Sequence, residues 1–153
     1  MSFRGNYRHS LNPQGRVSLP ARFRQVLVER YSPKLVLVGQ PEVVEVWPEE
    51  EYRQMEDALR GLKQKRKIGV QDYIFMQRAT LFEVEIDSQG RILLPPQLRE
   101  KMKLNNEVIF VGMPEKINMY SPESYAVIEE RANKNYDDNI QLVEDSQVLD
   151  PEK

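Results

Sequence analysis

Two short segments combine residue types that bind anions and nucleobases, at matching positions. Gln14-Gly15-Arg16 follows Asn12, and the same Gln-Gly-Arg triplet at residues 89–91 follows Asp87. An arginine guanidinium presents a planar fork of donors that fits a phosphate or the O6 and N7 atoms of guanine, and a glutamine amide can pair with adenine. A glycine leaves room for a phosphate to approach the backbone closely. These residue types indicate nucleic-acid binding.

The two segments differ in charge, and the difference predicts which of them meets DNA. Residues 1–24 contain five arginines and no acidic residue, whereas the equivalent residues 76–99 contain three arginines and three acidic residues. In the second segment Asp87 can pair with Arg91 across the turn, while in the first Asn12 can cap the turn without adding charge. We therefore expect the first turn to face DNA.

The predicted DNA contacts centre on Arg16, with its neighbours and the N-terminal arginines in support. The residues predicted to bind DNA are Arg16, Gln14, Gly15, Arg4 and Arg8. The set from the second half, predicted to be structural or a secondary contact, is Asp87, Gly90 and Arg91. A surface arginine beside an acidic residue often forms only an ion pair and binds no ligand, and this structural role is favoured for Arg91.

Both segments belong to a longer internal repeat. Residues 11–20 align with residues 86–95, with Gln, Gly, Arg, Leu and Pro at matching places. The alignment continues through the Gly-x-Pro-Glu turns at residues 39–42 and 112–115 to the aromatic residues beyond them. Self-similarity of this length indicates that each half of the chain is one structural unit.

Each half predicts the same order of strand, turn, strand, helix, strand, strand and helix. Alternating apolar residues at 82, 84 and 86 indicate a strand, Asn-Pro-Gln-Gly at residues 12–15 is typical of a type I turn, and proline at 20 and 95 suits the start of a helix. The other expected elements are strands at residues 16–19, 35–38, 43–47, 108–111 and 117–120, and helices at 20–30, from 48 and from 122. The aromatic residues predicted to pack between the halves are Trp47, Tyr52, Tyr120 and Tyr125.

A unit of this size is too small to bury its apolar faces alone, so the two units should pack about a pseudo-twofold axis. The predicted fold class is α+β, with duplicated hairpin and helix units in one domain. We expect a first repeat over residues 1–62, a linker with a helix over 63–80, a second repeat over 81–136 and an acidic, disordered tail over 137–153.

Composition excludes several classes of function. The chain has no cysteine and a single histidine, His9, so thiolate zinc sites and cysteine nucleophiles are excluded. It carries no serine-nucleophile or phosphate-loop motif. We expect no enzymatic activity, no metal and no cofactor. Without a run of about 18 apolar residues or a signal-peptide pattern, we also expect a cytoplasmic protein that does not contact membranes.

The duplicated motif resembles a known family. Phe3-Arg4-Gly5, the two Gly-Arg turns followed by Leu-Pro, and Val111-Gly112 before an aromatic strand end are similar to the MraZ family of bacterial regulators over residues 3–132. The resemblance implies an AbrB-like swapped-hairpin barrel with flanking helices. It also implies a nucleoid-associated transcriptional regulator of its own division and cell wall operon. Such a protein binds repeated promoter elements in double-stranded DNA as a ring-like homo-oligomer and takes no small-molecule substrate.

This sequence departs from the Asp-x-x-x-Arg signature of the family in its first half. The signature is intact at Asp87 and Arg91, whereas Asn12 replaces the aspartate ahead of Arg16. Two alternatives to DNA binding stay open. An AbrB-like antitoxin would be a protein-binding module that uses its acidic tail to hold a basic partner. RNA is the other alternative, although the sequence lacks an aromatic stacking platform of the RNP type.

Overall fold

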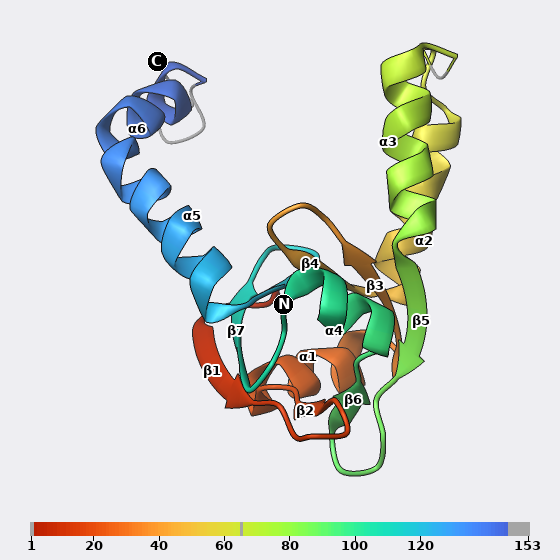
Figure 1. The fold of residues 1–153 in the computed structure, drawn as a ribbon. Helices are drawn as coiled ribbons and strands as arrows, with labels where there is room; N and C mark the ends of the chain where they lie inside the picture. Colours follow the sequence, from red (N-terminus) through yellow and green to blue (C-terminus); the bar gives the residue numbers. More distant parts are fainter. Residues whose placement is uncertain (1, 65, 147–153) are drawn as a thin grey trace. The chain divides into compact units, whose positions relative to one another are not determined.

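Two compact units make up the chain, and they divide at Pro122. The computed structural model describes residues 2–64 and 66–146 (Figure 1). The strands of the first unit are β1 (Asn6–Ser10), β2 (Arg16–Ser18), β3 (Lys34–Gly39), β4 (Val44–Pro48), β5 (Leu81–Glu85), β6 (Arg91–Leu93), β7 (Glu107–Gly112) and β8 (Ile117–Tyr120). The helices are α1 (Ala21–Arg30), α2 (Glu49–Arg60), α3 (Ile68–Ala79), α4 (Pro96–Met102), α5 (Pro122–Lys134) and α6 (Tyr136–Asp145).

The order of elements in each half is the predicted one, and the predicted α+β class is confirmed. Prolines mark the helix starts, because a proline lacks the N–H that the first turn would leave unpaired in any case. Thus α1 begins directly after Pro20 and α2 directly after Pro48. Three glutamates occupy the first turn of α2, where negative charge favours the helix dipole.

The two halves exchange their edge strands within one antiparallel sheet. The strand order is β1-β7-β8-β4-β3-β5, so β1 of the first half pairs with β7 of the second, and β5 of the second half pairs with β3 of the first. Tyr7 lies opposite Phe110 and Phe82 lies opposite Leu37. The short strands β2 and β6, one from each half, pair with each other in a separate two-stranded sheet. Neither half is therefore complete without the other.

Two expectations about the strands are wrong. The turns are tight, but β1 and β2 do not form a ladder with each other beyond the single bridge between Leu11 and Val17. The expected closed barrel is also not formed, since among the described residues β1 and β5 each pair with one strand only. The reason is the length of β2 and β6, three residues each. Pro20 and Pro95 follow closely and lack an N–H, so the pairing cannot extend to the edges of the large sheet.

The core draws on both halves. On one side of the sheet, α1, α4 and the β2–β6 pair supply fully buried residues such as Phe23, Leu98 and Ile92, which join Leu37 and Phe110 of the sheet. Burying side chains of this size contributes about 1.5–3 kcal/mol each relative to leaving them exposed. The halves are thus held together by a shared apolar interior.

A second, smaller cluster contains two of the four aromatic residues singled out in the sequence. Trp47 of β4 meets Tyr52 of α2 edge to face, with 5.7 Å between the ring centroids, beside Val36 and Val38 of β3. Tyr120 is buried as well, and Tyr125 is half-buried. Burial is as predicted. Trp47 and Tyr52 pack against each other within the first half, and from the second half Leu81 packs against the same cluster and the Lys116 ammonium lies 5.0 Å from the centroid of the Trp47 ring.

The predicted linker contains a helix, α3, that lies beside α2 (Figure 1). The hydroxyl of Tyr52 donates a hydrogen bond of 3.1 Å to Oε1 of Gln77, and both side chains are buried. Arg78 Nη1 lies 2.6 Å from Glu56 Oε2. These contacts hold the two helices together as a helical hairpin.

Part of the predicted disordered tail is helical. The second unit contains α6, which runs through ten residues of the region expected to lack structure, while residues 147–153 lie outside the described residues. Asp137 and Asp138 stand in its first turn, where they favour the helix dipole. An acidic run was therefore a helix start and not a sign of disorder. None of the described helices has the length and apolar character needed to cross a bilayer.

Candidate nucleic-acid interface

The first turn is closed by three short hydrogen bonds. The backbone N–H of Asn12 donates to the carbonyl of Arg16 at 2.9 Å, and the N–H of Gly15 donates back to the carbonyl of Asn12 at 2.9 Å. The side-chain Oδ1 of Asn12 also accepts from the N–H of Arg16 at 2.8 Å. Gly15 has a φ of +90°, a conformation that strongly favours glycine. Asn12 therefore caps the turn as predicted.

The second turn has the same geometry with a carboxylate in place of the amide. Asp87 N–H donates to the carbonyl of Arg91 at 2.8 Å, and Gly90, at a φ of +77°, donates to the carbonyl of Asp87 at 3.0 Å. Oδ1 of Asp87 accepts from the backbone N–H groups of Arg91 at 2.9 Å and Gln89 at 2.8 Å. The two turns thus differ mainly in charge.

That difference decides how the two arginines are held. Arg91 Nε lies 3.2 Å from Asp87 Oδ2, which confirms the predicted pairing across the second turn. The backbone N–H of Arg91, followed by that of Gln89 and by the Arg91 guanidinium, holds the pKa of Asp87 below its ordinary value. In the part of the chain that the structure describes, the half-buried Arg16 side chain has no ion pair or side-chain hydrogen bond. Its donors are available to a ligand.

Each turn is covered by an arginine from the other half. A Cβ on Gly15 would lie 2.8 Å from Nε of Arg99, and a Cβ on Gly90 would lie 2.6 Å from Cδ of Arg24. The Nε atoms of Arg24 and Arg99 are buried, and within the described residues they have no hydrogen-bond partner. Backbone hydrogen bonds also join the halves here. The carbonyl of Gly15 accepts from the N–H of Leu94, directly after β6, and the carbonyl of Gly90 accepts from the N–H of Leu19, directly after β2.

This packing corrects one role expected of Gly15. The glycine is buried beneath Arg99, so its backbone is not open to a phosphate. What the position requires is the positive φ and the space that Arg99 fills. Arg24 and Arg99 are not among the predicted site residues, although they occupy equivalent places in the repeat. Both halves have arginine at this equivalent position although most other equivalent positions differ, and this repetition could have indicated a shared role.

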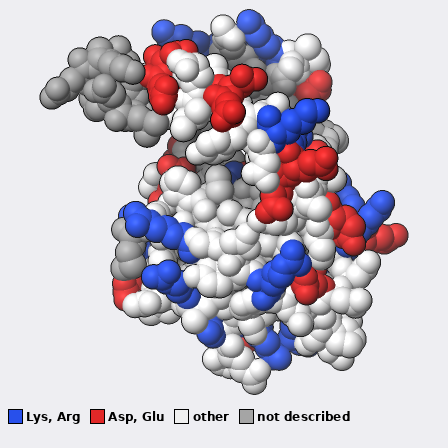
Figure 2. Space-filling view, turned by 90° about the vertical axis from the view of Figure 1, so that its left-hand side faces the viewer, with Lys and Arg blue, Asp and Glu red and all other residues white. Residues whose placement is uncertain are grey.

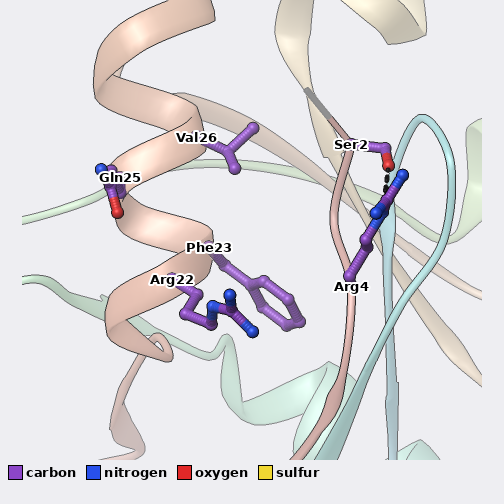
Figure 3. A pocket seen from close by; sticks show the side chains of 6 residues that line it. All are labelled: Ser2, Arg4, Arg22, Phe23, Gln25 and Val26. Atoms are coloured by element: carbon purple, nitrogen blue, oxygen red, sulfur yellow. Dashed lines mark hydrogen bonds between the residues drawn. The ribbon is translucent and has the colours of Figure 1, made fainter.

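Arg4 and Arg8 both lie outside the first turn, at different distances from it along the chain. Arg8 lies on β1 and pairs with Glu107 of β7, with 2.6 Å between Nη1 and Oε1. Arg4 precedes β1 and is separated from the turn by that five-residue strand, a span of roughly 13 Å or more. Its Nε donates to Ser2 Oγ at 3.3 Å, and Figure 3 shows the Arg4 side chain extending toward Ser2. Arg4 and Arg22 both line a cavity of about 320 Å³ beside α1. The support of the turn by Arg4 and Arg8 stays a prediction.

Basic side chains are spread over the surface around these elements. Figure 2 shows the side on which Figure 1 draws β1, and in its lower part Lys and Arg side chains are frequent with few acidic ones between them. A positive surface of this kind attracts polyanions over distances of about one Debye length, roughly 8 Å at physiological salt.

The described residues hold no group of three His, Asp or Glu side chains placed to bind a metal ion. His9 instead lies with Nδ1 2.6 Å from the carbonyl of Ser18 and its ring edge to face with Phe110 at 5.8 Å. The histidine therefore ties β1 to the end of β2.

Comparison with known proteins identifies the family. The family model described as "MraZ protein, putative antitoxin-like" matches residues 2–70 and 78–142. Transcriptional regulator MraZ of Heliobacterium modesticaldum is 33% identical over 138 residues, which cover 89% of this chain and 92% of the relative. Transcriptional regulator MraZ of Carboxydothermus hydrogenoformans is 35% identical over 121 residues, covering 79% and 82%. That of Desulforamulus reducens is 35% identical over 125 residues, covering 80% and 84%.

A solved structure of a Pyrococcus horikoshii protein aligns with a TM-score of 0.34 and 12% identity, over 80% of this chain and 98% of that one, which is too weak to carry an inference. The match to the family model covers nearly the whole sequence and both turns. This chain belongs to the MraZ family.

Proposed function

We propose that this chain regulates transcription by binding double-stranded DNA through its first turn. The observation that carries the proposal is the contrast between two equivalent arginines. Arg91 is held by Asp87 at 3.2 Å, whereas the Arg16 guanidinium has no partner among the described residues. The relatives named transcriptional regulators agree with such a role, which requires binding and no catalysis.

Arg16 is the proposed main contact, to a phosphate or a guanine edge. Its backbone is fixed by the Asn12 cap, so the side chain leaves the turn in a defined direction. Gln14, exposed at the tip, is proposed as a second contact to a base edge or a phosphate. Gly15 contributes by leaving room for Arg99 of the other half, which packs against the turn and restrains it. A rigid donor loses less conformational freedom on binding than a mobile one.

Arg4 and Arg8 are proposed as phosphate contacts that flank the turn. Arg8 would have to leave Glu107, and this costs little because an exposed ion pair contributes about 0–1 kcal/mol. Asp87, Gly90 and Arg91 are proposed to be structural or a secondary contact. The exchange of edge strands between the halves supports kinship with AbrB-like swapped-hairpin folds, here with an open sheet.

The proposed targets are repeated elements in the promoter of its own division and cell wall operon, as the family resemblance implies. A turn that neutralises two or three phosphates binds weakly, and its affinity falls steeply with salt. Several turns presented by a homo-oligomer to spaced repeats would convert weak contacts into avidity. The proposed place of action is the nucleoid in the cytoplasm.

A second candidate function is a protein-binding, antitoxin-like module, since the matching family carries that description. In this case the acidic second unit would be the binding element, and the first turn would matter little. Arg16 substitutions would then leave partner binding unchanged, which separates the two functions.

The decisive experiment is a gel shift with the DNA upstream of the chain's own operon, using Arg16→Ala and Arg91→Ala as a matched pair. We expect Arg16→Ala to abolish specific binding at moderate salt and Arg91→Ala to reduce it much less. Native mass measurement should show the same oligomer for both variants. Equal losses would contradict the asymmetry between the turns, and retained binding by Arg16→Ala would contradict the proposed function.

A further inference from the structure

One strand residue of this chain is apolar and yet exposed. Leu93, the last residue of β6, is 47% exposed, although its chain neighbours Ile92 and Leu94 are buried. Among the described residues, the other large apolar side chains with high exposure lie on helices or, for Leu62, in the loop after α2. A single exposed leucine is common by itself, so its neighbours decide whether it has a role.

Leu93 lies opposite Arg16 in the two-stranded sheet of β2 and β6, which we call the ribbon (Figure 1). The middle pair of the ribbon, Val17 and Ile92, is buried, and each of these residues is 1% exposed. Successive side chains of a strand point to opposite faces, so the remaining residues share the other face of the ribbon. They are Arg16, Ser18, Arg91 and Leu93.

The two arginines on this face have different cross-strand neighbours. The Cβ atoms of directly opposite residues in an antiparallel pair lie about 4.5–5.5 Å apart. Arg16, whose guanidinium has no partner among the described residues, therefore has the apolar Leu93 beside it. Arg91, which Asp87 holds at 3.2 Å, has Ser18 beside it. The leucine thus accompanies the arginine whose donors are available to a ligand.

We propose that the exposed face of the ribbon enters the major groove of DNA and that Leu93 contacts the C5 methyl group of a thymine there. This contact rests on the proposed function, DNA binding through the first turn, and adds a residue that determines sequence preference. The major groove is about 12 Å wide and admits a two-stranded ribbon, and apolar side chains recognise thymine by its methyl group. Successive bases are about 3.4 Å apart along the helix axis, so Leu93 reaches within about two base pairs of the Arg16 contact.

Backbone contacts fix Leu93 relative to the first turn. The N–H of Leu94 donates to the carbonyl of Gly15 at 2.8 Å, so the residue after Leu93 is bonded to the residue before Arg16. Leu94 is fully buried and anchors this end of the ribbon in the core. A side chain on a fixed backbone loses less conformational freedom on binding than one on a mobile loop.

Duplex RNA would not satisfy the ribbon. Its major groove is deep and narrow, so side chains cannot read the bases there. Uracil, which takes the place of thymine in RNA, also lacks the C5 methyl group. The contact of Leu93 would therefore select DNA over RNA as well as thymine over the other bases.

Deoxyuridine is the probe for this contact, because it removes the thymine methyl group and leaves base pairing unchanged. Gel shifts would use duplexes of the DNA upstream of the chain's own operon in which single thymines are replaced by deoxyuridine. At particular thymines of the element we expect the wild type to lose affinity about fourfold, the effect of taking one methyl-sized group out of an apolar contact. The loss should change little with salt concentration, since a methyl group carries no charge.

Variants of Leu93 show whether this residue reads the methyl group. Leu93→Ser introduces the residue type found at the equivalent position, Ser18, so the ribbon should tolerate it. We expect this variant to bind the thymine duplex more weakly and to be indifferent to deoxyuridine, because non-additive effects mark a direct contact. Leu93→Met keeps an apolar side chain of similar volume and should retain the dependence on the methyl group. Val28→Ser, at an 83% exposed position of α1, is the matched control and should also retain it.

Urea unfolding and native mass of each variant separate folding and assembly from DNA binding, and we expect both to match the wild type. A wild type that binds the upstream DNA but is indifferent to deoxyuridine at every thymine would overturn the contact and leave the proposed function of Arg16 intact. The same conclusion follows if Leu93→Ser keeps the wild-type dependence on the methyl group. A changed native mass for Leu93→Ser would place Leu93 between subunits, which contradicts the contact. Absence of specific binding by the wild type would instead overturn the proposed function, and this contact with it.

Discussion

Arg99 of the second half lies directly against Gly15 of the first, so that a Cβ on the glycine would sit 2.8 Å from the arginine Nε. Gly90 and Arg24 repeat the arrangement in the opposite direction. Each turn is thus supported by the helix of the other half. The shape of the proposed DNA-binding turn therefore depends on a contact with a residue 84 positions away in the chain, and mutations of that residue should affect the turn.

Gly15→Ala should destabilise the protein. The left-handed φ of +90° alone costs an alanine about 1–2 kcal/mol, and the new methyl group collides with Arg99 as well. Urea unfolding measures the effect. Gly69→Ala in α3 is the matched control, because it meets no atom within 4 Å and replaces glycine in a helix. It should be neutral or stabilise by about 0.5–1 kcal/mol.

The double variant Gly15→Ala with Arg99→Ala separates the two sources of cost. Removing Arg99 relieves the collision but not the φ, so part of the lost stability should return. The loss of one residue's effect when the other is absent is the signature of direct contact. Strictly additive effects of the two substitutions would contradict the packing of Arg99 on Gly15.

The sequence predicted where the chain turns but not which strands pair. The turn and the helix start after it are determined by local effects that act within a few residues. These effects are the side-chain cap of Asn12, the positive φ of Gly15 and the missing N–H of Pro20. Alternation of apolar residues shows which face of a strand is buried, but it does not show which other strand pairs with it. The pairing of β1 with β7 and of β5 with β3 depends on the packing of two halves, so a local hairpin was expected instead.

The candidate site was predictable in part for the same reason. The pairing of Arg91 with Asp87 follows from their spacing across one turn, and the structure has it at 3.2 Å. Arg99 packs on Gly15 although the two residues belong to different halves. Sequence spacing predicts contacts only between residues close together in the chain, so it could not predict this one. Arg4 was grouped with Arg16 because both are basic and early in the chain, whereas a strand separates them.

Asp87→Asn should make stability less dependent on acid pH. The folded protein holds the Asp87 pKa below its ordinary value of about 3.9, so the unfolded chain binds the proton more readily. The stabilisation is therefore complete above the ordinary pKa and is lost as the pH falls through the lower, folded value. Asparagine can still accept the backbone hydrogen bonds, as Asn12 does in the first turn.

Unfolding free energies from urea titrations between about pH 7 and pH 2 test this. The difference between wild type and Asp87→Asn should be largest at neutral pH and should shrink below about pH 4. A difference that stays constant over the range would show that the carboxylate charge does not contribute. Asp72→Asn, on the exposed side of α3, serves as the control.

Tyr52→Phe should loosen the α2–α3 hairpin. The buried hydroxyl donates to Gln77, and its removal leaves a buried acceptor without a partner, at a cost of about 1–3 kcal/mol. Burial raises the pKa of Tyr52 to about 12, so the hydroxyl is a donor at any physiological pH. Tyr73→Phe, at a half-exposed position on α3, should change stability by less than about 0.5 kcal/mol. Equal effects of the two substitutions would contradict the role of this hydrogen bond.

The salt dependence of DNA binding should report how many phosphates the first turn neutralises. Each phosphate contact contributes about 0.9 to the slope of log affinity against log salt concentration on duplex DNA. If Arg16 binds a phosphate, Arg16→Ala should reduce that slope by roughly one for each turn engaged. If it reads a guanine edge, the variant should lose preference for its promoter element with a smaller change in slope. Arg53→Ala on α2, which removes an exposed partner of Glu49, should change neither quantity. A slope and a preference both unaltered by Arg16→Ala would remove this residue from the interface, because a guanidinium that contacts DNA must contribute to at least one of them.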